Sequence, residues 1–212
     1  MPKNTFFNLP EEKRSLICDT AIDEFADYSF DQASINRIVS KSGISKGSFY
    51  QYFDDKSDLF VYIMQLIGQE KIKYISPLMF NPDEHDIFTL LREMYITGIQ
   101  FVQKHPRYES ISRNLLANKT APIYDELVAG SISTSIVFFE KLLVKAIDSG
   151  EVRGDIDIKL FAYLISTMNI SVIDYYIDYV SPNYDGAIME TVDKFIDFLR
   201  NGIGTKRDEI EK

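Results

Sequence analysis

The clearest hydrophobic pattern in the chain lies in its first third. Ile35, Ile38 and Val39 recur at helical spacing and predict a helix that Ser34 can cap at its start. Gly43 stands where this helix must end, because glycine adopts the left-handed backbone of a helix C-terminus at little cost. The pattern therefore predicts a helix of eight or nine residues followed by a tight turn.

A second, short helix of about residues 45–52 follows this turn. Phe49 and Phe53 lie four residues apart and share one buried face. The other positions are left to face outward: Lys46, Gly47, Ser48, Tyr50, Gln51 and Tyr52. A short polar helix held on a small core after a glycine turn is typical of a helix-turn-helix unit, whose second helix enters the major groove of DNA.

Apolar residues at helical spacing continue through the rest of the chain, with proline or glycine at most of the breaks. We find no strand-like alternation and no internal repeat. The pattern predicts an all-α protein of about nine helices, covering approximately residues 10–28, 34–42, 45–52, 56–76, 86–104, 106–118, 122–149, 157–180 and 184–201. We expect a three-helix N-terminal domain over residues 1–55 and a helical domain over residues 56–212.

The charge distribution changes this picture in one respect. The formal net charge is −9, and residues 1–60 alone hold seven basic and ten acidic residues. From Gln32 to Phe53, however, the cations Arg37, Lys41 and Lys46 occur without any acid. Phosphate contacts act within a Debye length of about 8 Å, so this local excess favours DNA binding. We expect strongly salt-dependent binding with little tolerance for non-specific DNA.

Several other classes of protein have little support in the sequence. One cysteine, Cys18, excludes an internal disulfide framework and fits a reducing cytoplasm. The N-terminus lacks the apolar run of a signal peptide. The longest apolar stretch, Phe161 to Val180, carries Asp174 and Asp178, which a membrane span would rarely hold, so we expect a buried helix and no membrane association.

Catalytic and metal-binding chemistry is also absent from the sequence pattern. His85 and His105 lie far apart without other ligands at metal spacing, so we predict no metal site. No nucleophile elbow, phosphate loop or supported pair of carboxylates occurs. We expect a protein that is not an enzyme and needs no cofactor.

One family shares the most regular part of this sequence. The stretch from Gly43 to Phe53, followed by Lys56 and Leu59, resembles the DNA-binding domain of the TetR-type bacterial transcriptional regulators. The resemblance is specific over about residues 9–60, and beyond them it covers only the number, lengths and order of the helices. It implies a helix-turn-helix domain joined to an α-helical ligand-binding and dimerisation domain. It further implies a homodimer that binds a palindromic operator, usually as a repressor, and that an unknown small-molecule effector releases.

The resemblance also implies roles for individual residues in DNA binding. Lys46, Gly47 and Ser48 would face base edges, and Gln51 would read adenine through its amide. Tyr50 and Tyr52 would contact phosphate through their hydroxyls, and Lys56 would do so at the start of its helix. Three further residues complete the predicted DNA-binding set, two of them as helix caps that donate to phosphate: Ser34, Ser45 and Arg37.

The second predicted domain is rich in aromatic residues, and buried tyrosines need partners for their hydroxyls. Aromatic residues at helical spacing also fit an ordinary core, but the resemblance implies a ligand-binding domain. On that basis we predict a ligand pocket that includes Tyr95, Phe101, Tyr108, Phe139, Met168 and Tyr175. The last two helices carry apolar faces that the family pairs across a two-fold axis. We predict a dimer interface formed by Met168, Val172, Ile188, Val192, Phe195 and Leu199.

Two other functions remain open at this stage. The chain could be an architectural or cell-cycle protein that binds DNA and uses its C-terminal domain to bind a protein partner. The acidic balance of residues 1–60 also allows a small-molecule-binding protein whose DNA-binding domain has degenerated.

Overall fold

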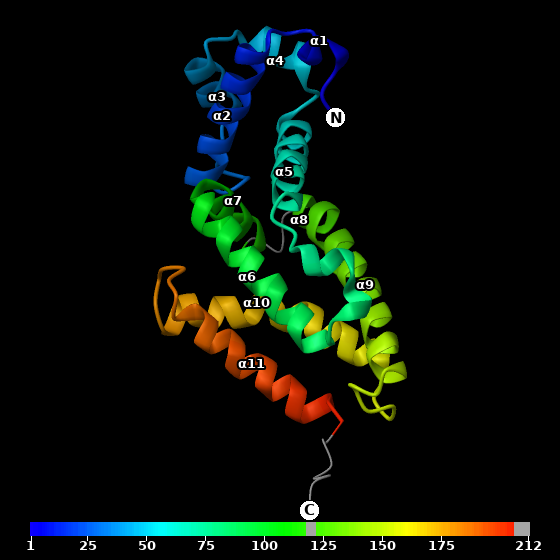
Figure 1. Cartoon of the computed structure of the whole chain (residues 1–212). Helices are drawn as coiled ribbons and strands as arrows, with labels where there is room; N and C mark the ends of the chain where they lie inside the picture. Colours follow the sequence, from blue (N-terminus) through cyan, green and yellow to red (C-terminus); the bar gives the residue numbers. More distant parts are fainter. Residues whose placement is uncertain (118–121, 206–212) are drawn as a thin grey trace, which may run out of the picture. The chain divides into compact units, whose positions relative to one another are not determined.

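The computed structural model describes residues 1–117 and 122–205. Within these ranges the chain is helical, and one isolated bridge between Val152 and Gly204 is the only β-type pairing (Figure 1). The α-helices are α1 (Asn4–Phe7), α2 (Glu11–Asp27), α3 (Ile35–Ser42), α4 (Lys46–Tyr52), α5 (Lys56–Ile72), α6 (Ile87–Lys104), α7 (Pro106–Ala117), α8 (Pro122–Tyr124), α9 (Gly130–Asp148), α10 (Ile158–Tyr179) and α11 (Ile188–Ile203). Three short turns are η1 (Pro77–Phe80), η2 (Pro82–Glu84) and the π-helical η3 (Asp125–Ala129). The prediction of an all-α fold is confirmed.

Two elements depart from the nine predicted helices. The single turn α1 is too short to show helical periodicity, yet its Phe6 is fully buried and packs on Phe53 with ring centroids 5.0 Å apart. The helix predicted over residues 122–149 is divided into α8, η3 and α9. Gly130 and the Ser/Thr-rich segment after it are weak helix formers, which is consistent with an interruption at this point.

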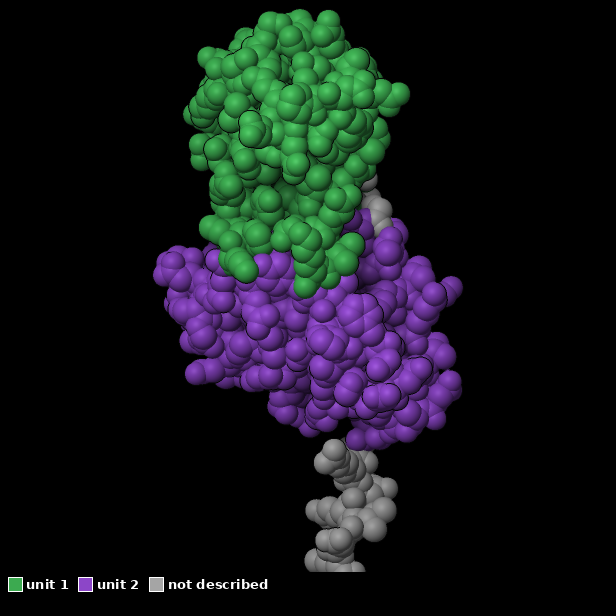
Figure 2. All heavy atoms as spheres, turned by 45° about the horizontal axis from the view of Figure 1, so that its top comes forward, with its two compact units in different colours: residues 1–73, 104–129 green, residues 74–103, 130–212 purple. Residues whose placement is uncertain are grey.

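The chain forms two compact units (Figure 2). Unit 1 contains Met1–Lys73 and Lys104–Ala129, and unit 2 contains Tyr74–Gln103 and Gly130–Lys212. Helices α5 and α7 thus belong with α1 to α4. A separate domain ending at residue 55 stays a prediction.

Unit 1 is built on an aromatic and aliphatic core. Helices α3 and α5 pack against α2, and α4 packs against α3 and α1. The fully buried side chains of this core include Phe6, Ile17, Phe25, Ile38, Phe49, Phe53, Leu59 and Ile63. Gly43 ends α3 with φ of 62° and ψ of 38°, the left-handed conformation predicted for it. The turn therefore redirects the chain from α3 into α4 without backbone strain.

Unit 2 is organised by α10, which packs against α9 and α11. Its core includes Leu91, Phe139, Ile165, Tyr176 and Val192, all buried. By length and composition α10 could cross a membrane, with a mean hydropathy of 1.3, and only 22% of its apolar window is buried. The prediction of a buried helix is therefore wrong for most of its surface, because α10 packs on the core along one face and leaves apolar side chains such as Tyr175 and Tyr179 exposed.

Candidate nucleic-acid interface

Helix α4 places most of the predicted DNA-binding residues on one accessible surface. The Ser45 Oγ accepts the N–H of Ser48 at 3.0 Å, as expected of the predicted N-cap. Ser45, Lys46, Gly47, Tyr50 and Gln51 are exposed, whereas Ser48 and Tyr52 are half-buried. The buried Phe49 and Phe53 hold the opposite face in the core, so the polar face points away from unit 1.

Ser34 begins α3, but its hydroxyl does not cap the helix as predicted. Its backbone N–H donates instead to the Glu24 carboxylate at 2.8 Å. A buried carboxylate from α2 thus binds the backbone N–H of the N-cap residue itself, and the serine hydroxyl forms no cap bond.

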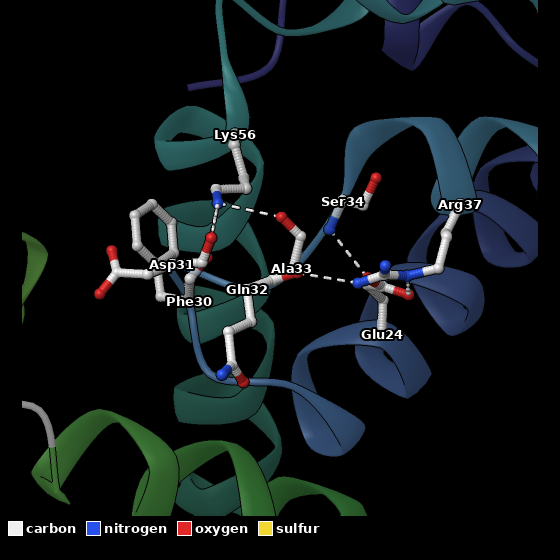
Figure 3. A network of polar contacts seen from close by, with 8 residues as sticks. All are labelled: Glu24, Phe30, Asp31, Gln32, Ala33, Ser34, Arg37 and Lys56. Atoms are coloured by element: carbon white, nitrogen blue, oxygen red, sulfur yellow. Dashed lines mark hydrogen bonds and ion pairs between the residues drawn. The ribbon is translucent and has the colours of Figure 1, made fainter.

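The ammonium group of Lys56 lies among the backbone carbonyls of the loop before α3 (Figure 3). Its Nζ donates to the Phe30 carbonyl at 2.6 Å, to the Ala33 carbonyl at 3.0 Å and to the Asp31 carbonyl at 3.3 Å. It also lies 4.6 Å from the centroid of the Phe30 ring. Burial lowers the pKa of Lys56, whereas the charges of Asp31 and Glu24 act to raise it. The structure thus places this side chain against the protein's own backbone.

Arg37 is held by the same loop and by Glu24 (Figure 3). Its Nε donates to both oxygens of the fully buried Glu24 carboxylate, at 2.8 and 3.0 Å, and its NH2 group donates to the Gln32 carbonyl at 2.8 Å. The guanidinium also stacks 4.1 Å from the centroid of the Tyr28 ring. Burial would raise the pKa of Glu24, but the hydrogen bonds from Arg37 and Ser34 outweigh it and hold this pKa below its ordinary value.

Two more lysines of unit 1 bind carbonyls at helix ends. The Lys13 Nζ donates to the carbonyls of Ser42 and Gly43, at 2.9 and 3.2 Å, where α3 ends. The Lys3 Nζ donates to the Tyr50 carbonyl at 2.9 Å, in the last turn of α4, and pairs with Asp54 at 2.7 Å. These side chains satisfy carbonyls that a short helix leaves without an internal partner.

Because these cations bind backbone carbonyls or carboxylates of the protein itself, two lysines remain available to a ligand. Residues 1–60 all lie in the described part of the chain, and within them only Lys41 and Lys46 have a cationic side chain without a hydrogen bond or ion pair. Both are exposed, one in the last turn of α3 and the other in the first turn of α4. The charge available to DNA is therefore concentrated on either side of the Gly43 turn.

Three acids of this region have partners within the chain. Asp23 pairs with Arg107 at 2.5 Å, Asp54 pairs with Lys3, and Asp55 caps α5 by accepting the N–H of Asp58 at 2.8 Å. Of these contacts, only the pair with Arg107 brings a positive charge from outside residues 1–60, so the net charge of this segment stays negative.

The six residues predicted for a ligand pocket lie in three different places. Tyr95, Phe101 and Phe139 are buried in unit 2, Tyr108 belongs to α7 of unit 1, and Met168 and Tyr175 line an open groove between α10 and α11. The groove has a volume of about 230 Å³ and is lined by Met168, Ser171, Val172, Tyr175, Thr191, Phe195 and Phe198. The structure therefore does not bring the predicted set together in one cavity.

The predicted dimer residues divide in a similar way. Met168, Val172 and Phe195 line the groove, whereas Ile188, Val192 and Leu199 are buried in the core of their own unit. The latter three face inward. The sequence did not separate them from outward residues, because helical periodicity marks both the inner and the outer apolar face of a helix. The exposed apolar residues of these helices include Tyr175, which was predicted for the ligand pocket and not for the dimer interface, and Phe198, which was in neither predicted set.

Comparison with known proteins identifies the family. A model of the bacterial regulatory proteins of the tetR family matches residues 17–63, the segment that contains α3, the Gly43 turn and α4. A solved TetR family transcriptional regulator from Chloroflexus aurantiacus is 31% identical, with a TM-score of 0.73, and the match covers 97% of this chain and 100% of that one. The chain belongs to the TetR family of bacterial transcriptional regulators. The predicted resemblance is confirmed.

Two further relatives show how widely the similarity extends. The probable acrEF/envCD operon repressor of Escherichia coli K12 is 28% identical over 158 residues, covering 73% of this chain and 69% of that protein. The transcriptional regulator FadR of Bacillus subtilis, solved in complex with stearoyl-CoA, is 15% identical with a TM-score of 0.70, covering 89% of this chain and 98% of that one. The second likeness shows a shared fold alone.

Sequence reasoning missed the contribution of Lys3, Lys13 and Glu24 to this TetR-family interface. Lys3 and Lys13 lie 47 and 29 residues from the carbonyls they bind, and no periodicity connects such distant positions. In the sequence, Glu24 is one of the ten acids among residues 1–60. A carboxylate one position before the apolar Phe25, on the inner side of that helix, was the available signal.

The depressed pKa of Glu24 predicts a pH-dependent stability. Its charged form stabilises the fold above the unfolded pKa of about 4.3, and this stabilisation is lost as the pH falls through the lower pKa of the folded state. Glu24→Gln should destabilise unit 1 by about 1–3 kcal/mol near neutral pH, since it weakens charge-assisted hydrogen bonds. Thermal unfolding followed by circular dichroism at neutral and acid pH measures both effects.

We expect the unfolding temperature of Glu24→Gln to fall less on acidification than that of the unchanged chain. Asp27→Asn is the matched control, because it removes an exposed carboxylate from the same helix. An equal fall in all three proteins would show that Glu24 is not the linked group.

Proposed function

We propose that the chain is a dimeric, sequence-specific transcriptional repressor that binds a palindromic operator and leaves it when a small molecule binds. The observation that carries this proposal is the exposed face of α4, with Lys46, Gly47, Tyr50 and Gln51 held outward by the buried Phe49. A short helix presented in this way after a left-handed glycine turn is suited to the major groove. The E. coli relative named as an operon repressor supports the direction of regulation.

The residues of α4 would make different contacts with DNA. Gln51 would reach base edges, and Gly47 would allow the backbone to approach the groove closely. Lys46, exposed in the first turn of α4, would contact phosphate. Tyr50, with 44% of its surface exposed, would donate to phosphate, as would the half-buried Tyr52. Lys41 would add a phosphate contact from the end of α3, a residue outside the predicted DNA-binding set.

A second copy of the chain would cover the groove between α10 and α11. Tyr175 and Phe198 are 54% and 64% exposed there, and the half-buried Phe195 extends the apolar surface. A dimer fits this surface better than a bilayer does, because α10 also carries the exposed Asp174 and Asp178. The helix-turn-helix units of two protomers related by a two-fold axis would require an operator with matching symmetry.

The effector would bind within unit 2. The Oδ1 of Asn169 is buried without a hydrogen-bond partner among the described atoms, and the hydroxyl of the buried Tyr95 reaches only the Asn169 carbonyl, at 3.5 Å. Buried polar groups of this kind are costly unless a ligand or water satisfies them. FadR, which shares this fold, was solved with stearoyl-CoA, an apolar chain with a polar head.

DNA binding should depend on Lys46 and Tyr50. If Lys41 and Lys46 of both protomers contact phosphate, the slope of log K against log salt concentration should be about −4. The double variant Lys46→Ala, Tyr50→Phe should reduce the magnitude of this slope by about 2 and lower affinity by at least tenfold. Fluorescence anisotropy with a duplex selected from a random pool measures both quantities.

Lys71→Ala is the control for this prediction, since it removes an exposed lysine from the last turn of α5. Parental affinity and slope in the double variant would refute the assignment of α4 as the reading helix.

The dimer should dissociate when its apolar surface becomes charged. Tyr175→Glu combined with Phe198→Glu places two carboxylates in the proposed interface, and we expect a monomer in sedimentation-velocity experiments at micromolar concentration. Lys159→Glu changes the net charge by the same amount at an exposed position outside the groove, and it should remain dimeric. A dimer in the double variant would place the interface elsewhere.

A further inference from the structure

We infer that Lys56 positions the helix-turn-helix unit of α3 and α4 and does not bind phosphate. It fixes the loop of residues 29–33, and through this loop the start of α3, against the first turn of α5. The inference rests on the proposed function, because it concerns how that function's DNA-binding surface is held.

The donors of Lys56 are already used. An ammonium group has three N–H donors, and three backbone carbonyls lie within 3.3 Å of Nζ. The face of the Phe30 ring covers the same group. A phosphate could therefore bind Lys56 only by displacing a carbonyl that would then lose its charged donor. The lowered pKa of this ammonium agrees with its removal from water.

The loop is fixed from its other side as well. Glu24 of α2 accepts the N–H of Ser34, and Arg37 of α3 donates both to Glu24 and to the Gln32 carbonyl (Figure 3). Lys56 binds the carbonyls of the residues just before and after Gln32. Side chains from α2, α3 and α5 thus fix the backbone of residues 30–34, and Lys56 is the side chain that α5 supplies.

The position of this loop determines the position of the proposed recognition helix, α4. α3 begins directly after the loop, and α4 packs against α3 and follows it through the Gly43 turn. Base readout requires side chains to be held within about 0.5 Å of the productive geometry. Loss of Lys56 should therefore disturb base contacts while leaving the phosphate-binding charges in place.

Lys46 provides the matched comparison. It is also a lysine in the first turn of a unit 1 helix, but it is exposed and forms no hydrogen bond or ion pair among the described residues. Removal of a phosphate-binding lysine weakens binding to all sequences and reduces the salt slope by about 0.9 per contact, or about 1.8 for a dimer. Removal of a positioning lysine should not change the slope.

The test compares Lys56→Met and Lys46→Met in the full chain. Each variant is titrated against a selected duplex and a scrambled duplex over a range of salt concentrations. Circular dichroism first establishes a temperature at which both variants are folded. For Lys56→Met we expect the parental salt slope, affinity for the scrambled duplex within about twofold of the parent, and roughly tenfold weaker binding of the selected duplex, the loss of about one base contact.

A third variant separates positioning from charge. Lys56→Gln keeps an N–H donor for the loop carbonyls without the charge, so it should recover part of the affinity for the selected duplex. A phosphate contact would not be recovered in this way.

Three results would overturn the inference. A slope reduced in Lys56→Met as much as in Lys46→Met would make Lys56 a phosphate-binding residue. Parental affinity for both duplexes in the folded variant would show that Lys56 contributes to stability alone. If the parent chain binds no duplex even at low salt, the proposed function fails and the inference fails with it.

Discussion

The DNA-binding region of this chain depends on bonds between charged side chains and backbone groups at helix ends. Helices α3 and α4 have only eight and seven residues, so they leave many N–H and C=O groups without a partner inside the helix. Helices this short are not stable in isolation. Lys13 and Lys3 bind carbonyls at the ends of these helices, Lys56 binds carbonyls of the loop before α3, and Glu24 binds the N–H at the start of α3.

This use of cations also explains how an acidic chain can carry a DNA-binding surface. Most basic side chains of residues 1–60 point toward the protein's own backbone or acids, where they organise the fold. Lys41 and Lys46 flank the Gly43 turn and remain for phosphate, in a segment that contains no acid. A small number of contacts at fixed positions favours specific over non-specific binding, because non-specific affinity grows with the number of neutralised phosphates.

The sequence predicted what local patterns determine. Apolar spacing located α2 to α7, glycine marked the left-handed turn at residue 43, and Ser45 was recognised as a cap. The role of Lys56 depends on carbonyls 23 to 26 residues away, which no local pattern encodes. Val192 is buried and Phe198 is exposed, although both fit the same helical period. Which of the two is buried depends on the helix that packs against α11. The split of the aromatic residues Tyr95, Tyr108 and Tyr175 among separate places has the same origin.

Selection of duplexes from a random pool at low salt shows directly whether α4 of two symmetric protomers reads DNA sequence. We expect enrichment of an inverted repeat whose half-sites are centred about one helical turn, or a multiple of it, apart. Enrichment of a single asymmetric site, or no enrichment at any salt concentration, would contradict it.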